Sequence, residues 1–366
     1  MKLHRRGLLM GAAGAAFAGF VLPERASALT GIAALDTPAI MVKTPANVLL
    51  VAITCTPGNR LVAVGEHGVV IYSDDDGLTW TQAAVPVNVT LTCVSFATPH
   101  IGWAAGHYGV ILNTQDGGQS WQMQLDGVQA NQLTMQAAQD PSVASNPSPG
   151  APLAARRAQH FMDGGPDNPF LTMLVFSPQK LMVFGAYRLT MLSNDGGKTW
   201  ADWSLHIYDK YSHNIYDAAL IGSTIYLALE EGLMFSSTDG GNTFLPLTSP
   251  GDVTLFGILG AGDGSLIVFG VAGALYRSAD GGKSWTQLAI ATQDDITGGR
   301  VLASGALVLV VESGPVFVSH DNGATFTRVQ NVPSEPYFDL QEAADGTVIA
   351  VGAAGVTTIS KSLLAS

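Results

Sequence analysis

Three consecutive carboxylates, Asp74, Asp75 and Asp76, form a cluster whose residue types and spacing could do chemistry. They belong to the stretch DDDGLTW, which ends at Trp80. Neighbouring carboxylates can ligate a divalent cation or act as an acid/base pair in hydrolysis. An acidic run followed by glycine is equally typical of a turn, because aspartate side chains accept hydrogen bonds from the turn backbone. The stretch alone leaves both interpretations open.

A second candidate is the stretch HIYDKYSHNIYD at 206–217, which offers His206, Asp209, His213 and Asp217 as metal ligands. Their spacing matches no specific zinc or calcium loop. We therefore favour a connecting loop rich in Tyr and His over a metal site. The chain also contains no phosphate-binding glycine loop and no Gly-x-Ser-x-Gly nucleophile turn. We expect no metal and no cofactor.

The stretch around Asp75 recurs along the chain as Ser/Thr-x-Asp-x-Gly-x-x-Trp/Phe. The six copies are SDDDGLTW (73–80), TQDGGQSW (114–121), SNDGGKTW (193–200), STDGGNTF (237–244), SADGGKSW (278–285) and SHDNGATF (319–326). Their shared aspartates are Asp75, Asp116, Asp195, Asp239, Asp280 and Asp321, at spacings of 41, 79, 44, 41 and 41. A period near 41 residues indicates a propeller or a solenoid.

Each copy is preceded by short β-branched runs separated by Gly and Asn/Asp, which predict four strands per unit. The stretch TVIAVGAAGVTTIS at 347–360 repeats the middle of a unit without the motif, so there are seven units. This pattern predicts an all-β fold, a seven-bladed β-propeller. The last unit stops after its third strand. We expect residues 35–42 (LDTPAIMV) to supply its outer strand and so to close the ring.

The spacing of 79 residues is one period plus an insertion, which occupies 127–169 between the second and third blades. Within it, SVASNPSPGAP has the composition of a loop. The stretch PLAARRAQHFMDGG predicts a short helix that starts near Pro152 and ends before Gly164. Its expected apolar stripe is Ala154, Ala158, Phe161 and Met162, which would leave Arg156, Arg157 and His160 exposed.

The six motifs resemble the BNR, or Asp-box, motif of sialidases and many other propellers. In that motif the aspartate closes a hairpin turn between the third and outer strands, and the aromatic residue packs between sheets. One copy per blade at the periphery does not suit a single active site. The Arg-Ile-Pro that precedes the first box of sialidases is absent. A BNR-repeat glycoside hydrolase or lectin nevertheless stays open as an alternative.

Residues 1–28 predict an export signal, with a basic start, an apolar run from Gly7 to Leu22 and a cleavage site after Ala28. The pair Arg5-Arg6 favours the twin-arginine route to the periplasm or an equivalent lumen. Residues 29–366 then form the propeller. The net charge of −12 argues against nucleic acid as a partner. No later stretch predicts a membrane span, and we expect a monomer.

Two further expectations follow from the repeat. Cys55 and Cys93 are offset by an odd number of residues on equivalent strands, so their side chains should point differently and we do not expect a disulfide. The turns between second and third strands share one face with the insertion, which makes this face the expected binding surface. Its candidate residues are Glu66, His67, His107, Tyr108, Arg156, Arg157, His160, Tyr187, Arg188, Glu230 and Glu231.

Several long segments resemble the photosystem II stability/assembly factor family of propellers. They include VGEHGVVIYSDDDGLTW, GWAAGHYGVILNTQDGGQSW, DGGPDNPF and YDAALIGSTIYLALEEGLMFSSTDGG. The resemblance implies a non-catalytic protein that assists assembly of the photosystem II reaction centre and holds its partner through an arginine-rich patch. The nearest equivalents of that patch here are Arg156, Arg157 and Arg188 in an acidic chain.

Relatives of that family also occur in bacteria without photosynthesis, beside genes for resistance-nodulation-division transporters, and the insertion at 127–169 resembles that branch. We therefore expect an exported scaffold or assembly factor for a membrane protein complex of photosystem or transporter type. An accessory protein of a resistance-nodulation-division transporter is one alternative, and a glycoside hydrolase or lectin is the other.

Overall fold

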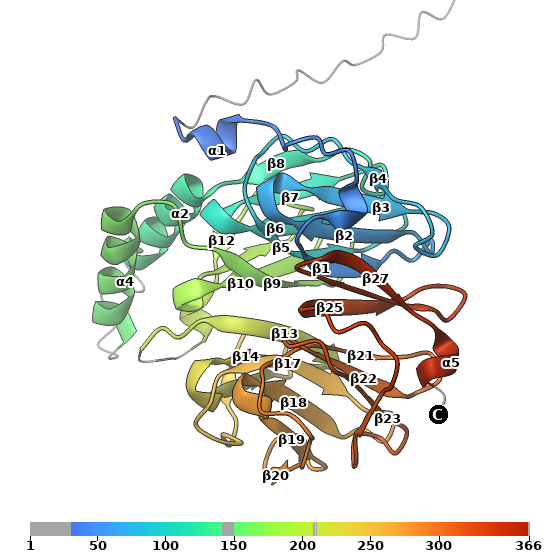
Figure 1. Cartoon of the computed structure of the whole chain (residues 1–366). Helices are drawn as coiled ribbons and strands as arrows, with labels where there is room; N and C mark the ends of the chain where they lie inside the picture. The colour runs from blue at the N-terminus through green and yellow to red at the C-terminus, as the bar shows by residue number, and fades with distance from the viewer. Residues whose placement is uncertain (1–30, 141–149, 208, 210, 365–366) are drawn as a thin grey trace, which may run out of the picture.

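A computed structural model describes residues 31–140, 150–207, 209 and 211–364. Seven antiparallel sheets are arranged around a central axis, and each is formed by strands consecutive in the sequence (Figure 1). The predicted seven-bladed β-propeller is therefore confirmed. The predicted export signal at 1–28 lies outside the described residues, as does the predicted loop SVASNPSPGAP except for its last three residues, 150–152, which begin the helix α4 (Gly150–Gly164).

Six blades have four strands each. Blades one to three contain β1 (Leu50–Cys55), β2 (Leu61–Gly65), β3 (Val70–Ser73), β4 (Thr81–Gln82); β5 (Leu91–Phe96), β6 (Gly102–Gly106), β7 (Ile111–Thr114), β8 (Gln122–Leu125); and β9 (Phe170–Val175), β10 (Leu181–Gly185), β11 (Thr190–Ser193), β12 (Ala201–Asp202). Blades four to six contain β13 (Ile215–Ile221), β14 (Thr224–Leu229), β15 (Met234–Ser237), β16 (Leu245–Pro246); β17 (Leu255–Gly260), β18 (Leu266–Gly270), β19 (Leu275–Ser278), β20 (Thr286–Gln287); and β21 (Ile296–Val301), β22 (Leu307–Val311), β23 (Val316–Ser319), β24 (Thr327–Arg328). Blade seven has β25 (Tyr337–Glu342), β26 (Val348–Gly352) and β27 (Gly355–Ile359).

Burial explains why these sequences form blades. The second strand of each blade is covered on both faces, and β2, with the sequence LVAVG, is buried at every position. The first strand lines the axis and carries a β-bulge near its start in every blade, as between Leu50 and Ala52 in β1. Such bulges bend and twist a strand. The apolar core is divided into clusters, most of which lie between neighbouring blades.

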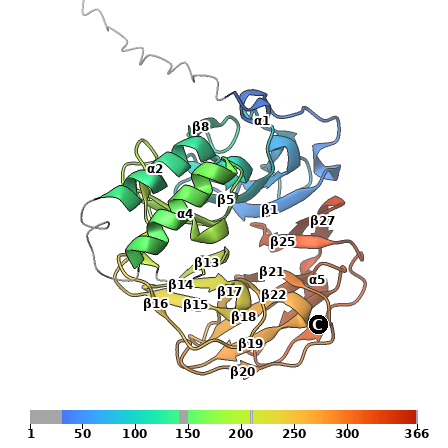
Figure 2. The same ribbon diagram turned by 90° about the vertical axis from the view of Figure 1, so that its left-hand side faces the viewer.

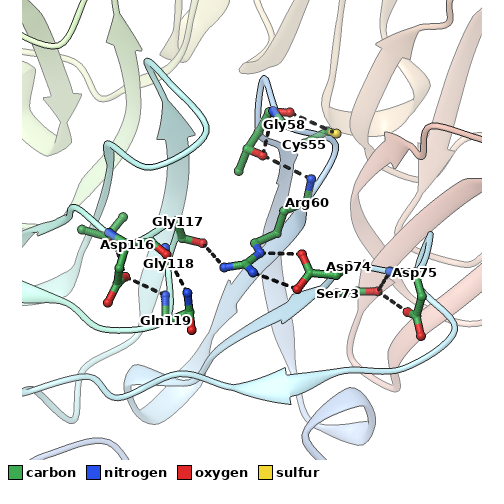
Figure 3. Close-up of polar contacts among 12 residues, drawn as sticks. Cys55, Gly58, Arg60, Ser73, Asp74, Asp75, Asp116, Gly117, Gly118 and Gln119 are labelled. Atoms are coloured by element: carbon green, nitrogen blue, oxygen red, sulfur yellow. Dashed lines mark hydrogen bonds and ion pairs between the residues drawn. The ribbon is translucent and has the colours of Figure 1, made fainter.

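All three carboxylates of the opening stretch have structural roles in the first box, and Figure 3 shows two of them, Asp74 and Asp75. Asp75 accepts hydrogen bonds from Ser73 Oγ at 2.7 Å and from the Thr79 backbone N–H at 2.8 Å, which closes the turn. Asp74 pairs with Arg60 through two bonds of 2.7 and 2.8 Å, and Arg60 also donates to the Gly117 carbonyl of blade two. Asp76 accepts the Ala344 N–H of blade seven at 3.0 Å. The stretch therefore joins blade one to both neighbours.

Closure of the ring differs from the sequence expectation. Residues 35–42 do not form the outer strand of blade seven. They lie along blade one, where Ala39 N–H donates to Val85 O and Val42 N–H donates to the Gln82 side chain. Contacts between inner strands close the ring instead, since Asp339 of β25 accepts the Ile53 N–H of β1 at 3.0 Å. The prediction was wrong because long-range pairing of a short apolar segment depends on contacts that its own pattern does not specify.

Short helices connect or cover the blades. The α-helices are α1 (Ala33–Asp36), α2 (Gly127–Gln139), α4 (Gly150–Gly164) and α5 (Lys361–Leu364), and the 3-10 turns are η1 (Pro45–Asn47), η2 (Glu66–Gly68), η3 (His107–Gly109), η4 (Ala186–Arg188), η5 (Ser204–His206), η6 (Glu230–Gly232) and η7 (Val271–Gly273). Helices α2 and α4 pack side by side over one face of the ring (Figure 2). Within the described ranges, no helix is both long enough and apolar enough to cross a bilayer.

The two cysteines lie on the innermost strands of neighbouring blades, Cys55 at the end of β1 and Cys93 within β5, and both are free thiols. Burial raises the pKa of the Cys93 thiol to about 12. The thiolate is the nucleophilic form, so Cys93 is unreactive at neutral pH.

Candidate functional site

The box aspartates are turn elements at the rim of each blade. Asp116, Asp195, Asp239, Asp280 and Asp321 repeat the bonds of Asp75 to the residues two before and four after them. Hydrogen bonds from Thr199 lower the pKa of Asp195 to about 2, and those from Thr325 do the same for Asp321. These carboxylates are therefore ionised and fully engaged by the protein.

The central channel contains two further carboxylates that are also bonded to the backbone. Asp217 on β13 accepts the Ile258 N–H of blade five at 2.9 Å and the Ala218 N–H at 2.8 Å. Burial raises its pKa to about 6, and the negative charge of Asp339 adds to this effect. Arg300 lies 3.9 Å from Asp339 and donates to Leu340 O. These groups connect adjacent blades and leave little bonding capacity for a ligand.

The face opposite the boxes carries the turns between second and third strands, which we call the tip face. In five of these turns, a non-glycine residue adopts the left-handed conformation: His67, Tyr108, Tyr187, Glu231 and Ala272, with φ between 51° and 57°. This conformation costs such residues roughly 1 kcal/mol or more. Four of the five nevertheless carry a large polar or aromatic side chain: His67, Tyr187 and Glu231 are exposed, and Tyr108 is half-buried.

Arg157 is buried, contrary to the sequence expectation that it is exposed with Arg156 and His160. Its guanidinium donates to Asp202 Oδ2 at 3.1 Å and to Arg188 O at 3.2 Å, and the two paired side chains are 4% and 0% exposed. The predicted stripe of α4 is otherwise correct for Ala154, Ala158 and Phe161, but Met162 is 46% exposed. Helix α4 packs against both α2 and blade three, so two of its faces are covered.

Arg188 is also buried, at 4% exposure, although it stands at the tip of a turn. Its guanidinium donates to Asp209 O, in the loop that leads into blade four. Of the three arginines expected to form a patch, only Arg156 is exposed. The other two hold the insertion and the loop at 203–214 onto blade three.

The loop at 203–214 joins the tips of blades three and four through Asn214. Its side chain accepts the Tyr187 N–H at 2.8 Å and donates to Glu230 at 2.9 Å. The adjacent His213 is buried and contacts Asp209 at 2.9 Å through Nδ1 and Glu231 at 3.4 Å through Nε2. The structure thereby brings Tyr187, Glu230 and Glu231 into one assembly.

The proposed metal ligands do not converge. Asp209 and His213 contact each other, but His206 stacks on Trp203 at 3.8 Å and Asp217 faces the central channel. No group of three His, Cys, Asp or Glu side chains in the described part of the chain could hold a metal ion.

Exposed apolar side chains occur on both insertion helices and on the tips that adjoin them. Val128 of α2 and Met162 of α4 are 37% and 46% exposed and line a small groove of about 140 Å³. His160 of α4 packs edge-on against Tyr187 at 5.5 Å, and Tyr211 packs near His213 at 5.8 Å. We call this surface the helix-side sector, and it consists of Val128, His160, Met162, Tyr187, Tyr211, Glu230 and Glu231.

The remaining tip residues lie outside the sector or at its border. Glu66 and His67 are exposed on blade one, where His67 contacts Asn88 at 3.1 Å. His107 is exposed at the tip of blade two, and Tyr108 beside it is half-buried against the core. The turn η3 that carries them contacts α2, so these two residues border the sector.

Sequence reasoning missed α2, and with it Val128. The segment GVQANQLTMQAAQ has few strongly apolar residues, so it gives no clear helical stripe. A local signal was available, because Asp126 caps the helix by accepting the Gln129 N–H at 2.9 Å. Tyr211 could not be assigned from the sequence, since its position depends on how the loop folds over blade four.

Solved structures of other proteins share this fold. Among solved structures, "YCF48 bound to D1 peptide" superposes with a TM-score of 0.63 at 15% identity, covering 88% of this chain and 98% of the other. YCF48 from Cyanidioschyzon merolae gives the same score and identity, covering 88% and 97%. A GH74 enzyme from Niastella koreensis gives 0.59 at 13% identity, covering 86% of this chain and 52% of the enzyme. At these identities the likeness shows the fold alone.

A search of curated proteins found no match. The family model described as photosynthesis system II assembly factor YCF48 matches residues 76–139 and 166–356, which is more than half of the chain. The match includes α2, the first helix of the insertion, and is interrupted only over 140–165, which contains α4. The chain therefore belongs to the YCF48 family of photosystem II assembly factor-like propellers.

Proposed function

We propose that this protein is an exported, non-catalytic docking protein that helps to assemble or service a membrane protein complex. It would act as a rigid disc that binds a partner segment on the helix-side sector and contributes contact area rather than chemistry. The proposal of a membrane protein partner is supported by family membership and by the relative whose structure was solved with a D1 peptide. A photosystem or a transporter complex would both fit this role.

The single observation that carries the proposal is the clustering of exposed apolar groups in the sector. Of nine large hydrophobic side chains found exposed in the described residues, four belong to it: Val128, Met162, Tyr187 and Tyr211. Contiguous apolar groups surrounded by polar ones are typical of protein interaction surfaces. Tyrosine is also enriched where interfaces gain most of their binding energy.

The charges of the sector indicate what kind of segment would bind. Glu230 and Glu231 stand at its edge, and Asp163 and Asp167 are exposed nearby, whereas Arg156 is the exposed arginine of the insertion. An acidic rim around an apolar centre favours a segment with apolar anchors and basic flanking residues. This differs from the arginine-rich patch that the family resemblance implied.

The channel carboxylates do not support the alternative of a glycoside hydrolase. Such an enzyme needs one carboxylic acid and one carboxylate directed at a bound sugar. Asp217 and Asp339 are instead directed at backbone amides of the next blade, Ile258 N–H and Ile53 N–H.

The test is capture of membrane proteins from detergent extracts of the native host. The double variant Met162→Ala/Tyr187→Ala should retain less than about a tenth of the partner, because it removes two central apolar anchors. Leu245→Ala is the matched control, since Leu245 is 63% exposed on β16 outside the sector. Equal capture by both variants would refute the assignment of the sector.

Export has its own test. Replacing Arg5 and Arg6 by Lys should leave an uncleaved precursor inside the cell if the twin-arginine route is used. Normal secretion and processing of that variant would contradict the proposal of that route.

A further inference from the structure

Blade seven differs from the other six because it has three strands among the described residues. Its outermost strand is β27, followed by Ser360 and the short helix α5. The outer edge of β27 therefore has no neighbouring strand in the part of the chain that the structure describes. Unpaired edges readily accept another strand, and proteins usually protect them with Lys, Pro or a bulge. The sequence GVTTI of β27 has no Lys or Pro.

The other blades show how the missing strand would bind. In five of them, the backbone N–H of the residue after the short fourth strand donates to the carbonyl of the third strand's first residue. These bonds are Ala83 to Val70, Trp203 to Thr190, Leu247 to Met234, Leu288 to Leu275 and Val329 to Val316, at 2.8 to 2.9 Å. The register of blade seven pairs Val351 with Val356, as Val64 pairs with Val70 in blade one. Val356 is therefore the equivalent acceptor.

Burial at this position supports the comparison. The side chains equivalent to Val356 are at most 1% exposed in the six complete blades: Val70, Ile111, Thr190, Met234, Leu275 and Val316. Val356 is only half-buried, and Thr358 two residues later is exposed. An apolar side chain that is covered in every other blade thus remains partly open to solvent.

The seam between blades six and seven, next to the residues that follow β27, also differs from the other seams. Helix α5 takes the position of the box turn, and Leu364 packs into the core of blade six. Beside it lies a cavity of about 600 Å³, lined by Ala306, His320, Asn322, Glu342, Lys361 and Leu364 among others. At the other seams this region is occupied by the box of the following blade, as where Arg277 donates to Asn322 O.

Two occupants from within the protein fit poorly. The N-terminal segment is held on blade one by the bonds of Ala39 and Val42, and it contacts β27 through η1, whose residues Ala46 and Asn47 lie next to Gly355 at the start of the strand. A second copy joined by pairing of two β27 edges would bury a contact only a few residues long. This is far below the roughly 1,000 Å² needed for a stable interface.

We propose that the open edge of β27 binds an extended segment of a partner protein, which adds a fourth strand antiparallel to β27. Strand addition uses main-chain hydrogen bonds for affinity and alternate side chains for specificity. The third residue of the segment donates its N–H to Val356 O, as Ala83 donates to Val70 O in blade one. That residue is apolar, because its counterparts Ala83 and Val329 are 1% and 6% exposed. This surface is separate from the helix-side sector.

The experiment uses the mature protein and a synthetic peptide with the sequence of residues 79–87, TWTQAAVPV, which carries the fourth strand of blade one. Binding is measured by fluorescence anisotropy of the labelled peptide. The control peptide has Ala83→Pro, which removes the donor to the Val356 carbonyl while the preceding residue keeps the extended conformation that a strand needs. Thr358→Pro in the protein removes an outward N–H at the edge, where proline is tolerated. Hydrogen exchange identifies the strand that gains protection.

The proposal predicts saturable binding, at least a tenfold weaker affinity for either proline variant, and slower exchange confined to residues 355–359. Equal binding of both peptides, no binding at 1 mM peptide, or protection of residues 70–73 through exchange with β4 would overturn it. Self-association of the protein that Thr358→Pro abolishes would also overturn it, because a second copy would then be the occupant. If Thr358→Pro fails to fold, hydrogen exchange of the unmodified protein with bound peptide is the test: protection at 355–359 supports the proposal, and protection at 70–73 contradicts it.

Discussion

Replacement of Arg157 by methionine tests whether this arginine is buried in an ion pair, as the structure has it, or exposed, as the helical pattern of the sequence predicts. Arg157 and Arg156 are adjacent, identical in type, and indistinguishable by the helical periodicity that predicts both to be exposed. The structure places the Arg157 guanidinium 3.1 Å from Asp202, with side-chain exposures of 4% and 0%. Arg156 is exposed. The two substitutions remove the same charge from neighbouring positions of one helix.

The magnitude follows from what Arg157→Met leaves behind. Methionine keeps most of the apolar stem that packs on Phe161, but it strands the Asp202 carboxylate without its counter-ion. Loss of one partner from a buried ion pair typically costs 3–5 kcal/mol. Asp202 still accepts bonds from Thr134 Oγ1 and the Ser204 N–H, so a value at the low end, about 3 kcal/mol, is expected. Arg156→Met should cost less than about 0.5 kcal/mol.

Urea denaturation followed by tryptophan fluorescence and by proteolysis within α4 measures both variants. Proteolysis is needed because the insertion can detach before the propeller unfolds. The double variant Arg157→Met/Asp202→Asn should recover part of the loss, since the stranded charge is gone. Equal stability of the Arg156 and Arg157 variants would refute the buried pair, and additive losses in the double variant would refute the coupling.

Three further predictions concern titration and the turn network. Hydrogen bonds from Thr325 lower the pKa of Asp321 to about 2. The ionised carboxylate therefore stabilises the folded state above pH 4, and this stabilisation is lost as the pH falls through 2. Asp321→Asn should reduce the dependence of the free energy of unfolding on pH in this acidic range. Burial raises the pKa of Asp217 to about 6, so between pH 4 and 6 this carboxyl is protonated in the folded state and ionised in the unfolded state. The free energy of unfolding should therefore fall by about 2 kcal/mol as the pH rises from 4 to 7. Asp217→Asn should remove that slope, and an unchanged slope would contradict the assignment. His213→Gln breaks contacts to Asp209 and Glu231, and it should accelerate hydrogen exchange at 212–216 without shifting global unfolding by more than about 2 kcal/mol.

The propeller fold could be predicted because the residues that form each box turn lie within the box itself. Asp75 and its five counterparts bond to residues within four positions, so local sequence specifies the turn and the period counts the blades. The alternation of apolar residues then places strands between the turns. Ring closure could not be predicted in the same way, because Asp339 and Ile53 are 286 residues apart.

The candidate site could be predicted only in outline. Topology predicts that the tips and the insertion share a face, and the structure places Tyr187 against His160 as this requires. Topology does not predict that Arg157 and Arg188 are buried. For Arg157, helical periodicity identifies one buried stripe, whereas α4 has two covered faces. For Arg188, burial depends on the loop that leads into blade four, whose Asp209 carbonyl accepts its guanidinium N–H. An arginine on a helix that pairs with a buried aspartate of a blade looks the same in the sequence as a solvated arginine.

The central claim is that the helix-side sector of this YCF48-family propeller docks a membrane protein, and site-specific photo-crosslinking tests it most directly. A photoreactive amino acid would replace Tyr187 in one preparation and Leu78, 82% exposed in the first box on the opposite face, in another. After illumination with native membranes, the account predicts a discrete membrane protein adduct from position 187 and none from position 78. An adduct from position 78 alone, or the same adducts from both positions, would contradict it.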